Sequence, residues 1–101
     1  MEERKYSDFN DESLLIESLN TISEMKAFMC HHCVSERKVE QLSTKVNELV
    51  AELNIRIKKL KSSGDSKEIN EMISILLNVV EELKNLIEKL RQRFLQTQPG
   101  A

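Results

Sequence analysis

Residues 39–60, VEQLSTKVNELVAELNIRIKKL, decide the fold of this chain. Their apolar residues recur in alternating steps of three and four, and the series is Val39, Leu42, Val46, Leu49, Leu53 and Leu60, interrupted by Arg56. This spacing is the heptad of a coiled-coil seam, in which one stripe of a helix packs against a neighbouring helix. The stretch therefore predicts a helix with one buried face. Arg56 is either a buried polar residue that fixes the register of the seam or, as we favour, a residue that buries its methylene groups while its guanidinium stays in solvent.

A further helix is predicted over residues 67–96, where some thirty residues run without Gly or Pro. It carries two neighbouring apolar seams. The first is Ile69, Met72, Leu76, Val79, Leu83, Leu86 and Leu90, and the second is Ile73, Val80, Ile87 and Phe94. A helix that pairs with one partner needs a single seam. We therefore expect this helix to lie between two others, from its own chain or from another.

The polar stretch KSSGDS, residues 61–66, predicts the turn before that helix. Gly64 suits a backbone position with positive φ, and Asp65 and Glu68 have the spacing of a capping box. At the other end of the chain, Asn10 offers an N-cap, and Phe9 and Leu14 have the spacing of a hydrophobic staple. A helix is therefore predicted to begin near residue 11, and its apolar residues are Leu15, Leu19, Ile22, Met25, Phe28 and Met29.

Residues 30–38 decide between two architectures. If the apolar spacing of residues 39–60 is extended toward the N-terminus, it falls on the polar residues Ser35 and His32 before it reaches Phe28. The apolar stripe is therefore interrupted, yet no Pro or Gly enforces a break in the helix. A continuous helix over 11–61, folded against 67–96, gives a long helical hairpin or coiled coil, which we favour. A break at 30–38 gives a three-helix bundle. The fold class is all-α in both cases, with a single helical domain over 10–97 and flexible tails at 1–9 and 98–101.

Charge is segregated along the chain. Residues 1–36 carry a net charge of -5, residues 37–61 carry +4 and residues 62–101 carry -1, within a total of -2. An acidic segment followed by a basic segment favours either their antiparallel contact or the docking of complementary partners. A dedicated nucleic-acid-binding protein is normally basic overall, so we expect no nucleic-acid partner.

Composition excludes several other classes. With 2 Gly, 1 Pro, 2 Cys and 4% aromatic residues, the chain is neither collagen-like nor a disulfide-stapled mini-domain. No long run of residues is free of charge, so no transmembrane segment is predicted, and the acidic start at Glu2 and Glu3 is unlike a signal peptide. These features favour an intracellular location, cytoplasmic or nuclear.

The sequence Cys30-His31-His32-Cys33 is the one cluster of residue types that commonly bind metals. A Cys-x-x-Cys pair is half of a zinc site, but the chain contains no second pair to complete it. On a helix the four side chains would not converge on one ion, and Cys30 and Cys33 would need ligands from another subunit. We therefore predict no metal and no cofactor, and we retain Cys30 and Cys33 as the candidate ligands of an alternative interpretation.

Motifs for catalysis are missing from the sequence. It has no Gly-rich phosphate loop, no nucleophile elbow and no pair of histidines at the metalloprotease spacing. We therefore expect that the protein is not an enzyme.

Three short stretches carry a resemblance to a known group of proteins: Leu42-Ser43-x-Lys45-Val46, Leu53-Asn54-Ile55 and Lys59-Leu60. They resemble the central heptads of the small coiled-coil subunits of the WASH and WAVE actin-regulatory complexes, over about twenty of the 101 residues. The resemblance implies a cytoskeletal-regulatory assembly and assigns no functional residue.

One helical hairpin cannot bury all of the apolar seams in this sequence. This excess of apolar surface predicts a non-enzymatic coiled-coil scaffold subunit. It would assemble through helix packing with itself or with partner helices, as a homo- or hetero-oligomer in an adaptor, tethering, kinetochore-type or cytoskeletal-regulatory complex. The predicted interaction seam is Leu15, Leu19, Ile22, Val39, Leu42, Val46, Leu49, Leu53, Leu60, Ile69, Leu76, Val80, Leu83, Ile87, Leu90 and Phe94. The alternative is a self-contained three-helix domain that binds a metal or ligand through the Cys30–Cys33 cluster.

Overall fold

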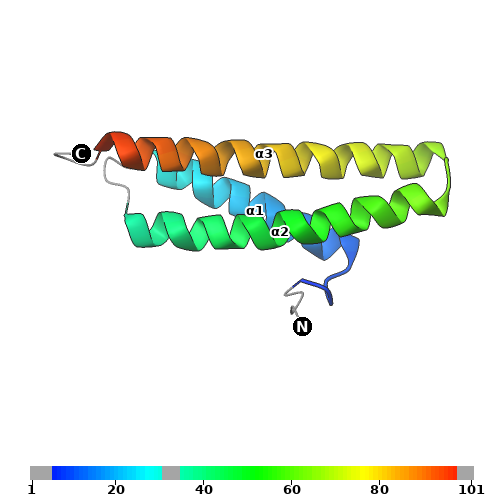
Figure 1. The fold of residues 1–101 in the computed structure, drawn as a ribbon. Helices are drawn as coiled ribbons and strands as arrows, with labels where there is room; N and C mark the ends of the chain where they lie inside the picture. The colour runs from blue at the N-terminus through cyan, green and yellow to red at the C-terminus, as the bar shows by residue number, and fades with distance from the viewer. Residues whose placement is uncertain (1–5, 31–34, 98–101) are drawn as a thin grey trace.

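The computed structural model describes residues 6–30 and 35–97, with side chains as far as residue 94, and these form three helices (Figure 1). The helices are α1 (Asp11–Met29), α2 (Glu36–Ser63) and α3 (Lys67–Thr97). Helices α2 and α3 form an antiparallel hairpin, and α1 packs against both of them away from the α2–α3 turn. The described residues contain no strand, which confirms the all-α fold class.

The predicted continuous helix over 11–61 does not form. Helix α1 ends at Met29, where the backbone N–H of Cys30 donates to the carbonyl of Ala27 at 3.1 Å. Helix α2 starts afresh with Ser35 as its N-cap, in an extended conformation and with its hydroxyl accepting from the Lys38 N–H. The residue types in this region are weak helix formers, and Ser35 supplies a cap where the helix can restart. The three-helix alternative is therefore the architecture of the chain.

The predicted helix starts are found, with one change of cap. The side chain of Asn10 accepts from the Ser13 N–H at 2.7 Å, so α1 begins where the sequence indicates. At α3 the cap is Ser66, whose hydroxyl accepts from the Ile69 N–H at 3.2 Å. Asp65, the predicted capping-box residue, instead accepts from the side chain of Asn70 at 2.9 Å.

Gly64 makes the turn between α2 and α3 feasible. Its φ is +141°, in a region that residues with a side chain rarely adopt. The chain can therefore reverse within three residues and place α3 directly against α2.

The core of the bundle surrounds α3. Both of its seams are buried in their middle part, from Leu76 to Leu90, because α2 and α1 each pack against it. The predicted pair of neighbours for this helix thus comes from the chain itself. The buried apolar residues are Tyr6, Leu14, Ile22, Met25, Val39, Leu42, Val46, Leu49, Leu53, Ile57, Leu76, Val79, Val80, Leu83, Leu86, Ile87 and Leu90.

The segment before α1 is part of the packed structure from residue 6 onward. Tyr6 is only 5% exposed, and its ring meets that of Phe9 edge to face with 5.2 Å between ring centroids. The Phe9 N–H closes a turn by donating to the Tyr6 carbonyl at 3.1 Å. The expected tail over residues 1–9 therefore does not extend over Tyr6–Phe9, while residues 1–5 and the expected tail at 98–101 lie outside the described residues.

Within the described parts of the chain, none of the helices combines the length and the apolar character required to cross a bilayer.

We predict that Leu83→Ala destabilises the fold by about 2–5 kcal/mol, because Leu83 is fully buried and its removal leaves a cavity. Leu77→Ala is the matched control on the same helix, since Leu77 is 46% exposed and its truncation should change the free energy of unfolding by about 0.5 kcal/mol or less. Urea denaturation followed by circular dichroism measures both. Equal losses for the two variants would contradict the described packing of α3.

Candidate interaction surfaces

The predicted interaction seam lies mostly inside the bundle. Leu19 is 48% exposed, and the half-buried members are Leu15, Leu60, Ile69 and Phe94. The buried members are Ile22, Val39, Leu42, Val46, Leu49, Leu53, Leu76, Val80, Leu83, Ile87 and Leu90. The folded chain therefore buries most of this seam by itself, and Leu19 is the member that stays exposed.

Three ion pairs join α1 to α2. Asp11 pairs with Arg56 at 2.6 Å, and Glu17 pairs with Lys45 at 2.7 Å. The third pair joins Glu24 to Lys38 at 2.7 Å. From the first pair to the third, the residue number rises along α1 and falls along α2, so the two helices are antiparallel. The segregation of charge along the sequence predicts this contact.

The Glu24–Lys38 and Glu17–Lys45 pairs each shift the pKa of one of their groups. The hydrogen bond from Lys38 lowers the pKa of the Glu24 carboxyl below its ordinary value, and burial opposes part of that shift. The hydrogen bond to Glu17 raises the pKa of the Lys45 ammonium above its ordinary value. Both shifts mean that the folded state favours the charged form of each group.

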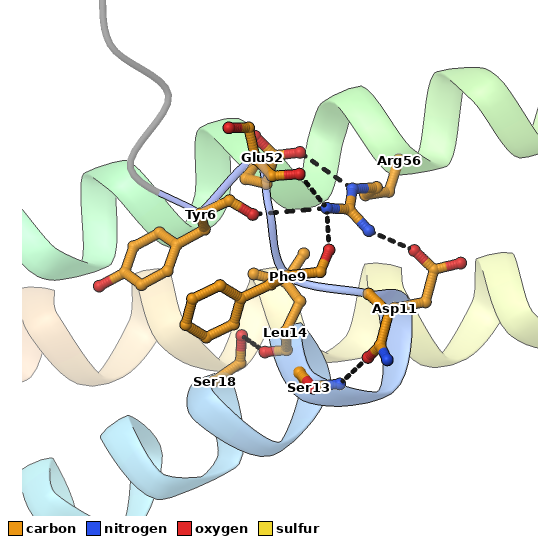
Figure 2. A network of polar contacts seen from close by, with 10 residues as sticks. Tyr6, Phe9, Asp11, Ser13, Leu14, Ser18, Glu52 and Arg56 are labelled. Carbon is orange, nitrogen blue, oxygen red and sulfur yellow. Dashed lines mark hydrogen bonds and ion pairs between the residues drawn. The ribbon is translucent and has the colours of Figure 1, made fainter.

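Arg56 lies at the centre of a nearly buried polar cluster (Figure 2). Its side chain is 12% exposed, and its Nε donates to Glu52 at 2.9 Å, a carboxylate that is itself 3% exposed. Its Nη1 bonds to Asp11 at 2.6 Å and its Nη2 donates to the carbonyl of Phe9. The predicted exposure of the guanidinium is therefore wrong, because the chain before α1 folds over it and supplies acceptors.

This cluster joins three parts of the chain: the N-terminal turn formed by Tyr6–Phe9, the first residue of α1, and the C-terminal half of α2. Burial by itself would lower the pKa of the Arg56 guanidinium, but its hydrogen bonds to Glu52 and Asp11 outweigh burial and raise that pKa. A cavity of about 370 Å³ borders the cluster, and its lining includes Phe9, Arg56 and Lys59. Because Arg56 is already bonded to two carboxylates, we assign no anion site to this cavity.

The candidate metal ligands are only partly within the described residues. Cys30 is exposed at the end of α1, with its thiol 3.5 Å from the Lys26 carbonyl oxygen. Cys33, with His31 and His32, lies outside the described residues. Among the residues that are described, no group of three or more His, Cys, Asp or Glu side chains is placed to hold a metal ion. The Cys30–Cys33 interpretation therefore stays a prediction.

Four large apolar side chains are close to half exposed: Ile16 (52%), Leu19 (48%), Ile75 (46%) and Leu77 (46%). An ion pair between Lys26 of α1 and Glu82 of α3, at 3.1 Å, fixes which sides of these two helices adjoin. Leu19 precedes Lys26 by seven residues and Ile75 precedes Glu82 by seven, so each lies on the same stripe as its ion-pair member.

We define the α1/α3 face by these two stripes. On α1 it comprises Glu12, Ile16, Leu19, Ser23 and Lys26, and on α3 it comprises Glu68, Glu71, Ile75, Asn78, Glu82, Asn85 and Lys89, all of which are exposed. Leu77 lies about 200° around α3 from Ile75 and belongs to the opposite flank. Ile16 and Ile75 were not among the predicted interaction residues, because both fall outside the heptad series. In the sequence, the signal that could have identified them is a large apolar residue at a helix position that does not belong to any of the seams.

Comparisons of the chain with protein-family models, with curated proteins and with solved structures found no match. The functional argument therefore rests on the fold and on the surface of this chain alone.

We predict that Arg56→Ala destabilises the fold by about 3 kcal/mol or more, because it removes the nearly buried guanidinium that bonds to Glu52, to Asp11 and to the Phe9 carbonyl. Lys59→Ala, an exposed cation one turn along α2, is the matched control and should cost about 0.5 kcal/mol or less. Thermal and urea unfolding give the two values. If Arg56→Ala lowered the free energy of unfolding no more than Lys59→Ala does, the polar cluster around Arg56 would not stabilise the packing of residues 6–9.

The Glu24–Lys38 pair predicts a pH dependence. Because the folded-state pKa of Glu24 is lowered from its ordinary 4.5, its stabilisation is present above that value and is lost as the pH falls through the folded-state pKa. The wild-type chain should therefore exceed Glu24→Gln in stability at neutral pH, and this difference should shrink in acid. Urea midpoints of both proteins across the acid range measure it. A difference that does not change with pH would contradict the assignment.

Proposed function

We propose that this chain is a non-enzymatic helical interaction module that joins a multiprotein complex through helix packing on its outer surface. The observation that supports the proposal most directly is the exposure of large apolar side chains outside the core, with Ile16 and Leu19 one turn apart on α1 and Ile75 on α3. Single exposed apolar residues are ordinary on protein surfaces, but neighbouring ones at this exposure mark sites of contact with another molecule.

The interaction module folds without its partner in this proposal. Helix α3 needs two neighbours, and α1 and α2 supply both of them. The partner therefore adds to a complete bundle and does not supply a missing core helix. This differs from the prediction that surplus seams need another chain, because α1 folds back and covers the second seam.

An intracellular setting, cytoplasmic or nuclear, forms part of the proposal. It is supported by the exposed thiol of Cys30, which suits a reducing compartment. The proposal of a non-enzymatic role draws on the lack of catalytic motifs in the sequence. The wider assignment to an adaptor, tethering, kinetochore-type or cytoskeletal-regulatory complex stays a hypothesis.

The proposal is tested by site-specific crosslinking in cells that express the full chain. A photoreactive amino acid in place of Ile75 should give a discrete protein adduct, because this position is expected to lie in an interface. The same amino acid in place of Glu40, an exposed residue on the outer side of α2, is the control and should give none. Adducts at neither position, or the same adducts at both, would overturn the proposed interaction role.

A further inference from the structure

The N-terminal turn fills a groove between α1 and α2. The turn contains neither helix nor strand, yet Tyr6 is almost fully buried and belongs to the core, and Phe9 packs against that core. Helix α1 packs less extensively on α2 than on α3, so the junction of α1 and α2 accommodates a further element. Figure 2 shows the rings of Tyr6 and Phe9 next to each other in this junction, with Leu14 of α1 beside Phe9.

The α2 wall of the groove is one stripe of that helix. Its members follow one another by three or four residues and are Lys45, Glu48, Glu52 and Arg56. Arg56 donates to the carbonyl of Tyr6 at 3.4 Å and to the carbonyl of Phe9. The Tyr6 side chain points away from Arg56 and comes under the charges of Lys45 and Glu48. The turn therefore lies along this stripe from Lys45 to Arg56.

The phenol of Tyr6 lies between the two helices. Burial raises the pKa of this phenol above its ordinary value, Lys45 of α2 opposes that shift, and Glu17 of α1 adds to it. Glu17 and Lys45 are themselves paired across the junction at 2.7 Å. The ring of Tyr6 is thus close to charged groups of both helices.

Capping of α1 does not account for this arrangement. Asn10 caps the helix, and a hydrophobic staple requires only Phe9 and Leu14. Tyr6 lies outside both motifs, and the bonds from Arg56 hold backbone carbonyls that precede the helix. The turn therefore occupies the groove as a bound peptide does, through two aromatic rings three residues apart and through its carbonyls.

The N-terminal turn can leave the groove without disrupting a helix. The hydrogen bonds that start α1 are made by Asn10, and the bond from the Phe9 N–H to the Tyr6 carbonyl stays within the turn. Arg56 keeps Asp11 and Glu52 as partners when the turn leaves, so its charge is not stranded. Local opening of this kind needs less free energy than unfolding of the whole bundle.

We propose that the N-terminal turn is an internal ligand and that the groove it fills is a docking site for a similar turn of a partner protein, an inference that rests on the proposed interaction function. The partner segment would carry two aromatic side chains three residues apart and would present backbone carbonyls to Arg56. Its binding would displace Tyr6 and Phe9. Because the internal turn is tethered beside the groove, it keeps the site closed until such a partner competes with it.

The first test follows Tyr6 in the wild-type full chain. The chain has a single tyrosine and no tryptophan, so its intrinsic fluorescence reports on Tyr6 alone. The probe is a capped peptide, FSDFN, which repeats residues 6–10 with phenylalanine in place of tyrosine. A large excess of this peptide should displace the turn and increase the quenching of Tyr6 fluorescence by acrylamide. A peptide with alanine at both aromatic positions should leave the quenching unchanged.

The second test measures binding to an emptied groove. Tyr6→Ala combined with Phe9→Ala removes both rings of the internal ligand, and circular dichroism checks that the helices are retained. The FSDFN peptide should bind this variant about tenfold or more tightly than it binds the wild type, because the tethered turn no longer competes. Chemical-shift changes in the labelled protein should locate the peptide at Leu14 and Arg56.

A matched control is available within the same turn. Ser7 and Asp8 are both exposed, so Ser7→Ala combined with Asp8→Ala should bind the peptide as weakly as the wild type does. Equal affinity for all three proteins would overturn the proposal. Unchanged quenching of Tyr6 in the wild type would also overturn it, because the turn would then be a permanent part of the core. This second outcome decides the matter even if the variant without the two rings does not fold.

Further outcomes separate this inference from the interaction function on which it rests. Sedimentation of the wild type should show a monomer, and a dimer lost on Tyr6→Ala with Phe9→Ala would overturn the proposal by making a second copy the occupant. If crosslinking at Ile75 succeeds but the peptide does not bind, the groove proposal is wrong and the interaction function stands. If the peptide binds but Ile75 gives no adduct, the groove stands and the interaction role tested at Ile75 is overturned. If both fail, both are wrong.

Discussion

The structure depends on a single constraint, which is that α3 cannot leave either of its two apolar stripes in water. Each buried leucine of such a stripe stabilises the fold by about 1.5–3 kcal/mol relative to exposure, so one unsatisfied stripe would offset much of the stability of a small domain. The chain meets this constraint twice. Gly64 allows α2 to cover one stripe through a tight reversal, and the end of α1 at Met29 lets α1 return to cover the other.

The polar contacts determine how α1 sits on that hairpin. The side chain of Arg56 bonds to the N-terminal turn, to the first turn of α1 and to Glu52 in the C-terminal half of α2. Its charge is retained in a nearly buried position because Glu52 and Asp11 accept from it and because backbone carbonyls fill its remaining donor directions. Packing thus supplies most of the free energy, while the guanidinium fixes the position of α1 along α2.

Local signals in the sequence were sufficient for much of this fold. Asn10 marks the start of α1, Gly64 marks the reversal, and the opposite charges of the first two segments indicate their antiparallel contact. The break before Ser35 could not be derived in this way. It forms because α1 gains burial against α3 when it turns back, and that gain is tertiary.

The same reasoning explains what was missed at the surface. Arg56 was expected in solvent, because its acceptors come from residues more than forty positions away in sequence. Leu19 was placed in a buried seam, but it lies on the outer flank of α1, while Leu14 enters the core. Which stripe of an isolated helix faces inward depends on its neighbours, so the α1/α3 face became visible only in the folded chain.

The ion pairs between α1 and α2 also select the handedness of the bundle. Three consecutive helices can form two near mirror-image arrangements, with the first helix on either side of the hairpin formed by the other two. The side opposite α1 is marked by the hydrogen bond from Arg91 to Ser43, and α2 presents Ser43, Asn47 and Asn54 there. A first helix on that side would separate Glu17 and Glu24 from Lys45 and Lys38, with which they pair in the observed arrangement. Pairs that are individually weak thus add to the preference for one of the two arrangements.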